Sequence, residues 1–425
     1  MPPLEGIRVI ELGVMIAVPA ATSNLAGFGA SVIKVEDTIA GDELRKYGST
    51  RNGMSAWFAN ANSGKRSISI DLNTSEGKKI LWDLLAKADV FIQGFRTGVT
   101  EKLGFGYKEV SEKHPELIYC SSTGFGETGP YSNLPAYDPV IQGLSGWAGI
   151  QLVDKDPTLH KTMVSDKTAA MYNTQAILAA LVQRASTGKG CFIEASMLDS
   201  NIMFNWPDVM MQCSLLEEDS LDLPNVLESY RLYRCADGFV TVSPGTDRQW
   251  NSFCDALGAA QQKVDEKLVT SKDRAKNIEY FFDTVARVVS KFDRSTIVGK
   301  LRDVGVPSGP VYLPEQVKDD PQVQARKTVR RYHHKIIGDF LGPKPLASMF
   351  GEAISLGDAP LQGEHTLEIL SELGYAENVQ KDLLEKSVIC DWRNPDVIRV
   401  APHPLYNSYV EVFNFVKILK DAIEN

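Results

Sequence analysis

The sequence lacks the features that mark several large classes of protein. It has no run of 18 apolar residues, so we expect no membrane-spanning helix. Residues 1–12 lack a basic region followed by an apolar core, so we expect no secretory signal. The six cysteines show no CxxC or other metal-binding spacing, and the six histidines include no HExxH pattern. We therefore expect reduced thiols, a cytoplasmic location and no metal site.

Positive charge is also outnumbered. The chain has 45 Lys and Arg residues against 54 Asp and Glu residues, and the net charge of −9 argues against nucleic acid as its partner. What is present is ordinary: 43% hydrophobic and 23% charged residues indicate a soluble globular protein. A length of 425 residues leaves room for two or more domains.

Strand-like and helix-like stretches alternate through the first 200 residues. Residues 7–12 and 31–35 have the pattern of strands, with a helical stretch at 18–28 between them, and this spacing predicts an α/β fold with a parallel, Rossmann-like sheet. The turn after the first strand, GVMIAVPA, is not GxGxxG, so no dinucleotide cofactor is predicted. Further strands are expected at 67–72, 90–93, 117–120 and 192–195, and a helix at 76–88.

The second half of the chain predicts a smaller α+β domain. An acidic stretch at 214–228 reads as a linker, and Tyr230–Val242 reads as a hairpin around Asp237-Gly238. Helices are expected at 247–257, 271–291, 293–304, 314–326 and 365–373, with strands and turns at 335–356. The predicted division is 1–212 for the first part of the large domain, 213–228 for a linker, 229–312 for the small domain, 313–375 for a return to the large domain, and 376–425 for a tail.

Asp166 stands at the start of a long helical run that ends at the glycines 188 and 190. One interpretation is an N-cap, whose carboxylate accepts hydrogen bonds from the first N–H groups of the helix. The other is a nucleophile, because a carboxylate held ionised by the helix dipole can attack a thioester and form a covalent acyl-enzyme. The residue alone leaves both interpretations open.

Ordered segments along the chain resemble family III CoA-transferases of the CaiB/BaiF type, which include formyl-CoA:oxalate and carnitine CoA-transferases. The resemblance covers roughly residues 4–375. Its segments are LEGIRV at 4–9, GASVIKVE at 29–36, NSGKRS at 62–67, FRTG at 95–98, GFG at 124–126, TGPY at 128–131, AYD at 136–138, the stretch around Asp166, RASTGKG at 184–190, VPSGPV at 306–311 and GEHT at 363–366.

This resemblance implies an enzyme with a Rossmann-like large domain and a small domain, in a homodimer of two interlocked ring-like chains. It places the family's nucleophilic aspartate at Asp166 and implies aspartyl anhydride and aspartyl-CoA thioester intermediates. Acyl-CoA and a small carboxylic acid are the implied substrates, with coenzyme A as co-substrate and no other cofactor. The phosphates of CoA require basic side chains. The candidate CoA-binding residues are Glu36, Arg45, Lys65, Arg66, Arg96, Lys102, Gly124 and Tyr137.

The sequence also departs from the family pattern. Gly94 stands where many members have an asparagine, so a side-chain amide that could contact CoA is missing. The run of glycines found in formyl-CoA transferases is absent, which disfavours oxalate as the acceptor. Tyr137 replaces the histidine of the related racemases, which disfavours two-base proton transfer. Racemase or isomerase activity, and a silent CoA-binding protein, are the alternatives.

The tail carries a second resemblance. Residues 386–420 resemble the C-terminal segment of kynureninases, through DWRNP at 391–395, RVAP at 399–402 and PLYN at 404–407. In that family the arginine matching Arg399 holds a substrate carboxylate. No earlier segment resembles a domain carrying a lysine for pyridoxal phosphate, so we predict no such cofactor. We expect two strands and a helix, Tyr409 to Ile423, with a packing role.

Overall fold

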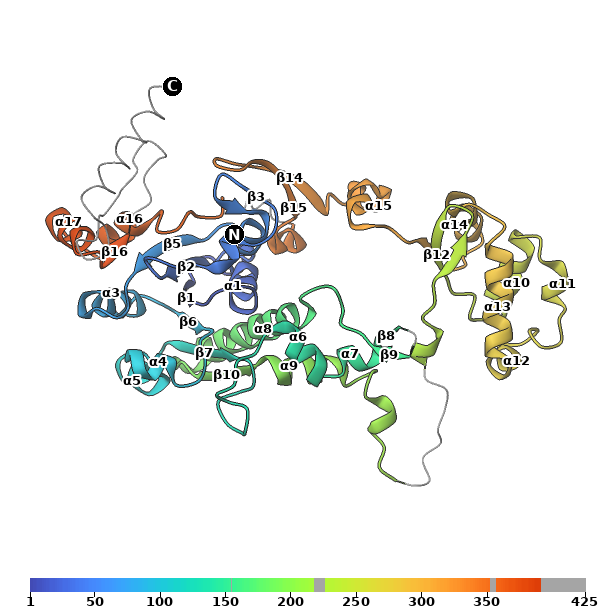
Figure 1. Cartoon of the computed structure of the whole chain (residues 1–425), viewed down its shortest axis with the longest axis horizontal. Helices are drawn as coiled ribbons and strands as arrows, with labels where there is room; N and C mark the ends of the chain where they lie inside the picture. Colours follow the sequence, from blue (N-terminus) through green and yellow to red (C-terminus); the bar gives the residue numbers. More distant parts are fainter. Residues whose placement is uncertain (154, 218–225, 352–356, 391–425) are drawn as a thin grey trace, which may run out of the picture.

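The computed structural model describes residues 1–153, 155–217, 226–351 and 357–390. Its centre is a seven-stranded sheet with the order β10-β7-β6-β1-β2-β5-β16 (Figure 1). All neighbours are parallel except β16, which is antiparallel to β5. The strands are β1 (Arg8–Leu12), β2 (Ser31–Glu36), β5 (Arg66–Ile70), β6 (Val90–Gln93), β7 (Ile118–Thr123), β10 (Phe192–Ser196) and β16 (Ile389–Cys390).

The six parallel strands confirm the predicted Rossmann-like fold. Numbered along the chain from one to six, they have the spatial order 3-2-1-4-5-6 of a doubly wound sheet. In such a sheet the strand order reverses between the first and fourth strands, here β1 and β6. Ligands of doubly wound proteins bind at the carboxyl ends of the strands beside this reversal.

Helices cover both faces of the sheet because its central strands are apolar on both sides. On β1, Val9 packs into the core beneath α1 (Ala17–Gly27) and α8 (Val164–Thr187). The next residue, Ile10, packs into the core on the other face. That face is covered by α3 (Ser75–Leu85), α16 (Thr366–Glu372) and α17 (Glu377–Glu385).

Shorter elements surround the carboxyl edge of the sheet. Near α1 lie α2 (Ala56–Asn62) and the hairpin of β14 (Val329–His334) and β15 (Gly338–Pro343). The remaining elements of this body are η1 (Glu43–Lys46), β3 (Thr50–Arg51), β4 (Met54–Ser55), α4 (Val99–Leu103), α5 (Tyr107–Lys113), α6 (Asp138–Leu144), α7 (Trp147–Ile150), β8 (Leu152–Val153), β9 (Asp156–Pro157), α9 (Met197–Asn205), η2 (Met211–Cys213) and η5 (Leu346–Phe350).

A separate small unit has its own sheet and core, at the right of Figure 1. Strands β11 (Tyr233–Cys235), β12 (Gly238–Val242) and β13 (Ser308–Pro310) pair antiparallel in that order. Its core is built around Trp250, Phe253 and Val285, each fully buried. The helices are η3 (Val226–Ser229), just before the sheet, α10 (Asp247–Ala256), α11 (Ala260–Lys263), α12 (Ser271–Lys276), α13 (Ile278–Val289) and α14 (Arg294–Asp303). The limits 229–312 for this domain stay a prediction.

Two helices predicted as continuous are interrupted. The helix expected at 271–291 breaks at Asn277, whose backbone is not helical and whose side chain donates to the Asp273 carbonyl oxygen. The helix expected at 314–326 is a 3₁₀ turn, η4 (Pro314–Asp319), followed by α15 (Pro321–Ala325). Asp320 separates them because it precedes a proline, which disfavours helical backbone, and its carboxylate caps α15.

Part of the predicted tail belongs to the main core. Helix α17 and strand β16 fall within 376–425, yet Leu383, Leu384 and Ile389 are buried with Ile10 beneath the large sheet. The strands and helix expected for the rest of the tail, and Arg399, lie outside the described residues. Among the helices that the structure describes, none has the length and apolar character needed to cross a membrane.

A buried network of charges ties the carboxyl ends of β1 and β2 to the start of β5. Both carboxylate oxygens of Glu11 are engaged, at 2.7 Å from the Lys34 ammonium and 2.8 Å from the Lys65 ammonium. Lys34 also contacts Asp42 at 2.8 Å, and Thr22 donates to Glu11. Burial would raise the pKa of Glu11, but the two ammonium groups outweigh it and lower this pKa to about 2.

The same network fixes the loop between β1 and α1. Lys34 donates to the Gly13 carbonyl oxygen at 2.7 Å, and Lys65 donates to the Pro19 carbonyl oxygen at 2.8 Å. Asp42 accepts from the Met15 N–H at 3.1 Å. The loop and the first turn of α1 are therefore held at three points by buried charged groups.

Replacing Glu11 with glutamine should destabilise the large body, because the Lys65 ammonium would stay buried without its counter-charge and Lys34 would keep only Asp42. Loss of one partner of a buried ion pair costs roughly 3–5 kcal/mol. We expect a loss of about 3 kcal/mol in the first unfolding transition in urea. Since the folded-state pKa of Glu11 lies below its ordinary 4.5, the stabilisation is present above pH 4.5 and is lost as pH falls toward 2.

The matched control is Glu112→Gln, a change at an exposed glutamate of α5. It should alter stability by less than about 0.5 kcal/mol. If Glu11→Gln is as mild as this control, the ion network does not hold the strand ends together.

Candidate active site

Asp166 lies in the first turn of α8, and it is not the N-cap. The helix begins at Val164, its N-cap is Met163, and no side chain of the cap residue bonds the helix. The prediction that the helix starts after Asp166 is therefore wrong by one turn. Asp166 is half-buried and its backbone N–H already has an acceptor elsewhere. Its carboxylate is left to face a cavity.

The capping carboxylate comes from another helix. Asp138, the first residue of α6, accepts from the Ser165 N–H at 2.7 Å and the Asp166 N–H at 3.1 Å through one oxygen. Its other oxygen accepts from the Gln142 side-chain amide at 2.5 Å. Asp138 is buried, so these bonds satisfy a carboxylate that water does not reach. The N-cap function, one of the two interpretations of Asp166 from the sequence, is thus performed by a residue 28 positions earlier.

The electrostatics of Asp166 also differ from the prediction. Burial raises the pKa of Asp166, the nearby negative charge of Asp138 raises it further, and together they bring it to about 7. The expected stabilisation of the carboxylate by the helix start is outweighed, because Asp138 occupies the first N–H groups. Near neutral pH Asp166 therefore exchanges between a carboxylate and a carboxylic acid, as reactive carboxyl groups often do.

The cavity that Asp166 faces lies at the strand-order reversal. Its volume is about 310 Å³. The loop after β1 contributes Val14 and Met15, and the start of α1 contributes Ala17 and Val18. The end of β6 contributes Gly94 to Arg96, and the end of β7 contributes Ser122 to Gly124. This is the place where doubly wound sheets bind ligands. Four predicted site residues meet here: Arg96, Gly124, Tyr137 and Asp166.

Two glycines let the chain approach closely around this cavity. A Cβ atom at Gly94 would lie 2.8 Å from a methyl group of Val18, so a larger residue would push α1 away from β6. A Cβ atom at Gly124 would lie 2.3 Å from the Cβ of Ala136. Both distances are too short for carbon atoms, so the walls of the cavity require glycine at these two positions. The same short distance to Val18 explains why this chain has glycine at position 94 and not the asparagine of many family members.

Arg96 is the basic residue of this cavity. It is exposed, and it forms no ion pair with any residue in the described part of the chain. Tyr137 is 66% exposed at the rim. An unpaired guanidinium beside a cavity can bind a phosphate or carboxylate in bidentate fashion.

The other predicted CoA ligands do not line this cavity. Arg45 and Glu36 bind each other, with Nη2 to Oε1 at 2.7 Å, and the Arg45 guanidinium stacks 3.7 Å from the centre of the Phe58 ring. Lys65 uses all three of its N–H groups on Glu11, Pro19 and Asn62. We therefore assign these three residues to the support of the strand ends.

Arg66 and Lys102 do not line the Asp166 cavity either. Arg66 pairs with Glu368 at 2.9 Å and Glu372 at 2.5 Å on α16. Lys102 is exposed on α4 and contributes to no cavity wall described here. Of the basic residues predicted to bind the phosphates of CoA, Arg96 therefore lines the cavity. The other four do not line it: Arg45, Lys65, Arg66 and Lys102.

A second cavity, missed from the sequence, adjoins the first. Its volume is about 660 Å³, and it shares Asp138, Pro139 and Met163 with the cavity of Asp166. Its cationic residues are Lys161 and Lys167. The sequence feature that could have indicated this cavity is the position of Lys167 directly after Asp166.

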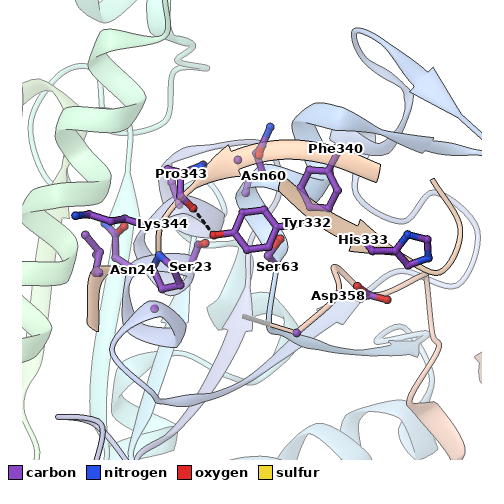
Figure 2. Close-up of a pocket in the computed structure, with 17 residues that line it drawn as sticks. Ser23, Asn24, Asn60, Ser63, Tyr332, His333, Phe340, Pro343, Lys344 and Asp358 are labelled. Atoms are coloured by element: carbon purple, nitrogen blue, oxygen red, sulfur yellow. Dashed lines mark hydrogen bonds between the residues drawn. The ribbon is translucent and has the colours of Figure 1, made fainter. Parts of the chain in front are cut away.

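A third cavity of about 240 Å³ lies between α1, α2 and the β14–β15 hairpin (Figure 2). Tyr332 extends into it and donates its hydroxyl hydrogen to the Pro343 carbonyl oxygen at 2.8 Å. None of the predicted site residues lines it.

Known proteins resemble this chain over most of its length. The sequence model of CoA-transferase family III matches residues 4–366, and that of the kynureninase C-terminal domain matches residues 362–419. The succinate–glutarate CoA-transferase of Agrobacterium fabrum is 35% identical over 338 residues, covering 76% of this chain and 84% of the relative. The human succinyl-CoA:glutarate CoA-transferase is 30% identical over 396 residues, covering 91% of this chain and 90% of the relative. A crystal structure of a CAIB/BAIF family protein from Brucella suis has 30% identity and a TM-score of 0.74, covering 87% of this chain and 99% of that one.

Replacing Asp138 with asparagine should lower the pKa of Asp166. The amide keeps an oxygen for the N–H groups of Ser165 and Asp166 and removes the neighbouring negative charge, although it loses the bond donated by Gln142. Because burial is the larger cause of the shift, the pKa should fall below about 7 without returning to 3.8. Infrared difference spectra recorded during a pH titration would measure it, with Asp166→Asn identifying the signal. A pKa that does not fall in Asp138→Asn contradicts the proposed coupling.

Proposed function

The chain belongs to CoA-transferase family III, and we propose that it moves CoA from an acyl-CoA thioester to a free dicarboxylic acid, with Asp166 as the nucleophile. The observation that carries this proposal is the Asp166 carboxyl group, half-buried and facing a cavity at the strand-order reversal. Its own helix is capped by Asp138, so the Asp166 side chain is not needed for structure.

The proposed reaction has four steps. An Asp166 oxygen attacks the thioester carbonyl carbon, the C–S bond breaks, and CoA thiolate leaves a mixed anhydride behind. The thiolate then attacks the carboxyl carbon of the Asp166 side chain, which releases the donor acid and forms an aspartyl-CoA thioester. The acceptor carboxylate attacks that same carbon and expels CoA thiolate, giving a second anhydride. The thiolate attacks the acceptor acyl carbon, which forms the new acyl-CoA and restores the Asp166 carboxylate.

The physical chemistry of the site suits these steps. A pKa near 7 leaves part of Asp166 ionised at neutral pH while making its carboxylate more basic than an exposed aspartate. Anhydrides react with water, so a nucleophile in a cavity of protein walls is protected where an exposed one is not. Arg96, at the same cavity, is suited to an anionic part of CoA.

The relatives support a dicarboxylic acceptor. The names of the bacterial and human proteins specify succinate, succinyl-CoA and glutarate, all with two carboxyl groups in the free acid. We carry this substrate class to the present chain as part of the proposal. The predicted homodimer is likewise proposed, and light scattering of the purified protein would measure the mass in solution.

Asp166→Ala should abolish CoA transfer, because a covalent route cannot proceed without its nucleophile. We expect a loss of at least about 10³-fold in kcat. The assay follows transfer from succinyl-CoA to glutarate by mass spectrometry. Asp166→Asn is the closest variant in shape and should be equally inactive, while both remain folded by circular dichroism. Retention of more than a tenth of the wild-type turnover would assign Asp166 a supporting role only.

Wild-type protein incubated with succinyl-CoA should carry a covalent adduct on Asp166. Hydroxylamine attacks the activated carboxyl and leaves a hydroxamate, which peptide mass spectrometry would place within the sequence. An enzyme that turns over but never yields this modified peptide does not use the anhydride route. Exchange of the α-hydrogen in deuterated water without CoA transfer would favour a racemase instead.

Arg96→Ala should raise the KM for CoA esters by about tenfold and change kcat less. A contact to a part of CoA remote from the reacting carbon is formed equally in the ground and transition states. Arg66→Ala is the matched control, since Arg66 pairs with α16 and lies outside the cavity. Equal KM values for the two variants would remove Arg96 from the CoA site.

A further inference from the structure

The second cavity extends from the Asp166 site toward α2. It lies between Trp57 and Asn60 of α2, the segment 159–163, and the first turn of α8. Asp138, Pro139 and Met163 line both cavities, so a molecule that reaches Asp166 can extend into this space. Its volume of about 660 Å³ is twice that of the first cavity. There is room for an acyl chain of several carbons.

Two cations distinguish this cavity from its neighbour. Lys161 and Lys167 line it, and Lys161 forms no ion pair with any of the described residues. Lys167 donates to the Thr162 hydroxyl at 2.6 Å, which leaves two of its three ammonium hydrogens available. The acidic residue in the wall is Asp138, and its oxygens already accept from Ser165, Asp166 and Gln142. The wall therefore carries two ammonium groups against the one carboxylate of Asp138, and this balance of charge favours an anion.

Further groups in the wall suit an acid with an apolar middle. Ile16, Leu159 and Met163 provide apolar surface, and Trp57 provides a ring face. His160 also lines the cavity, and its buried Nε2 has no hydrogen-bond partner among the residues that the structure describes.

We propose that Lys161 and Lys167 bind the second carboxylate of a dicarboxylic substrate while its first carboxyl group reacts at Asp166. This inference rests on the proposed function and adds the residues that select the substrate class. Asp166 and Lys167 are consecutive on α8, so their side chains project about 100° apart. One faces the first cavity and the other the second. Met163 lines both cavities, so a dicarboxylate bound between Asp166 and the lysines would lie against it.

The same lysines serve both halves of the reaction. A dicarboxylic donor keeps its far carboxylate in the thioester and in the anhydride on Asp166, and a dicarboxylic acceptor keeps its far carboxylate in the second anhydride. Two ammonium groups stabilise that charge throughout, so the acyl group stays positioned while CoA leaves and returns. A monocarboxylic acid lacks this contact and leaves the lysines without their counter-ion.

The test compares acids that differ only in the second carboxylate. Isotopically labelled succinate is paired with butyrate, and glutarate with valerate, as acceptors from unlabelled succinyl-CoA, so that mass spectrometry separates newly formed succinyl-CoA from the donor. In the double variant Lys161→Met/Lys167→Met, the ratio of kcat/KM for succinate to that for butyrate should fall at least about tenfold, since a charge-assisted bond is lost from one acid only. The double variant Lys161→Arg/Lys167→Arg keeps the charges and should retain most of the preference.

Lys189→Met is the matched control. Lys189 is exposed beyond the far end of the 24-residue helix α8 and should leave the ratio unchanged. Calorimetric titration of glutarate into Asp166→Asn gives a readout without turnover, and adding the two methionine changes should weaken binding about tenfold.

Two results would overturn the proposal: a wild-type enzyme that uses butyrate as efficiently as succinate, or a methionine double variant with an unchanged ratio, whether both acids lose efficiency equally or neither does. Failure of the proposed function looks different. In that case no acid accepts CoA from succinyl-CoA, and Asp166 variants behave as wild type.

Discussion

The structure depends on the buried contact of Glu11 with Lys34 and Lys65. One carboxylate holds two ammonium groups from neighbouring strands, and those ammonium groups hold the carbonyl oxygens of Gly13 and Pro19. The loop between these carbonyls forms one wall of the Asp166 cavity. Removing charges from water is costly unless each has its counter-charge, so the network tolerates little rearrangement. The rigidity of that wall follows from electrostatics rather than from apolar packing alone.

Two carboxylates at the start of α8 have different surroundings. Asp138 is fully engaged by N–H donors and acts as a structural cap, while Asp166, one turn into the helix, keeps a carboxylate that faces a cavity. The negative charge of the cap also raises the pKa of its neighbour. Two residues of the same type thus take opposite roles because their surroundings differ.

Most of the large sheet could be predicted from the sequence because its strands are short runs rich in β-branched residues, separated by amphipathic helices. At Val90–Gln93 the predicted and observed strands coincide. Asp166 could be identified by motif, but its electrostatics could not. The cap comes from Asp138 across 28 residues, and no local pattern reports that contact. Lys65 shows the same limit: an isolated basic residue reads as a ligand, and only the fold reveals Glu11 beside it. The break at Asn277 comes with a local side-chain bond that helical periodicity does not reveal, whereas the break at Asp320 follows from Pro321, which the sequence does show.

The strand β16 has a consequence for the order of events during synthesis. It covers the outer edge of β5, pairing Ile389 with Ile70, and its neighbours α16 and α17 complete the core that contains Ile10. A chain still on the ribosome has made the parallel strands long before residue 389 emerges. Until then the β5 edge and an apolar face of the sheet are uncovered, and both are templates for unwanted association. The nascent protein is therefore exposed to unwanted association until its last described strand is made. A chaperone that shields an open sheet edge would act in that interval.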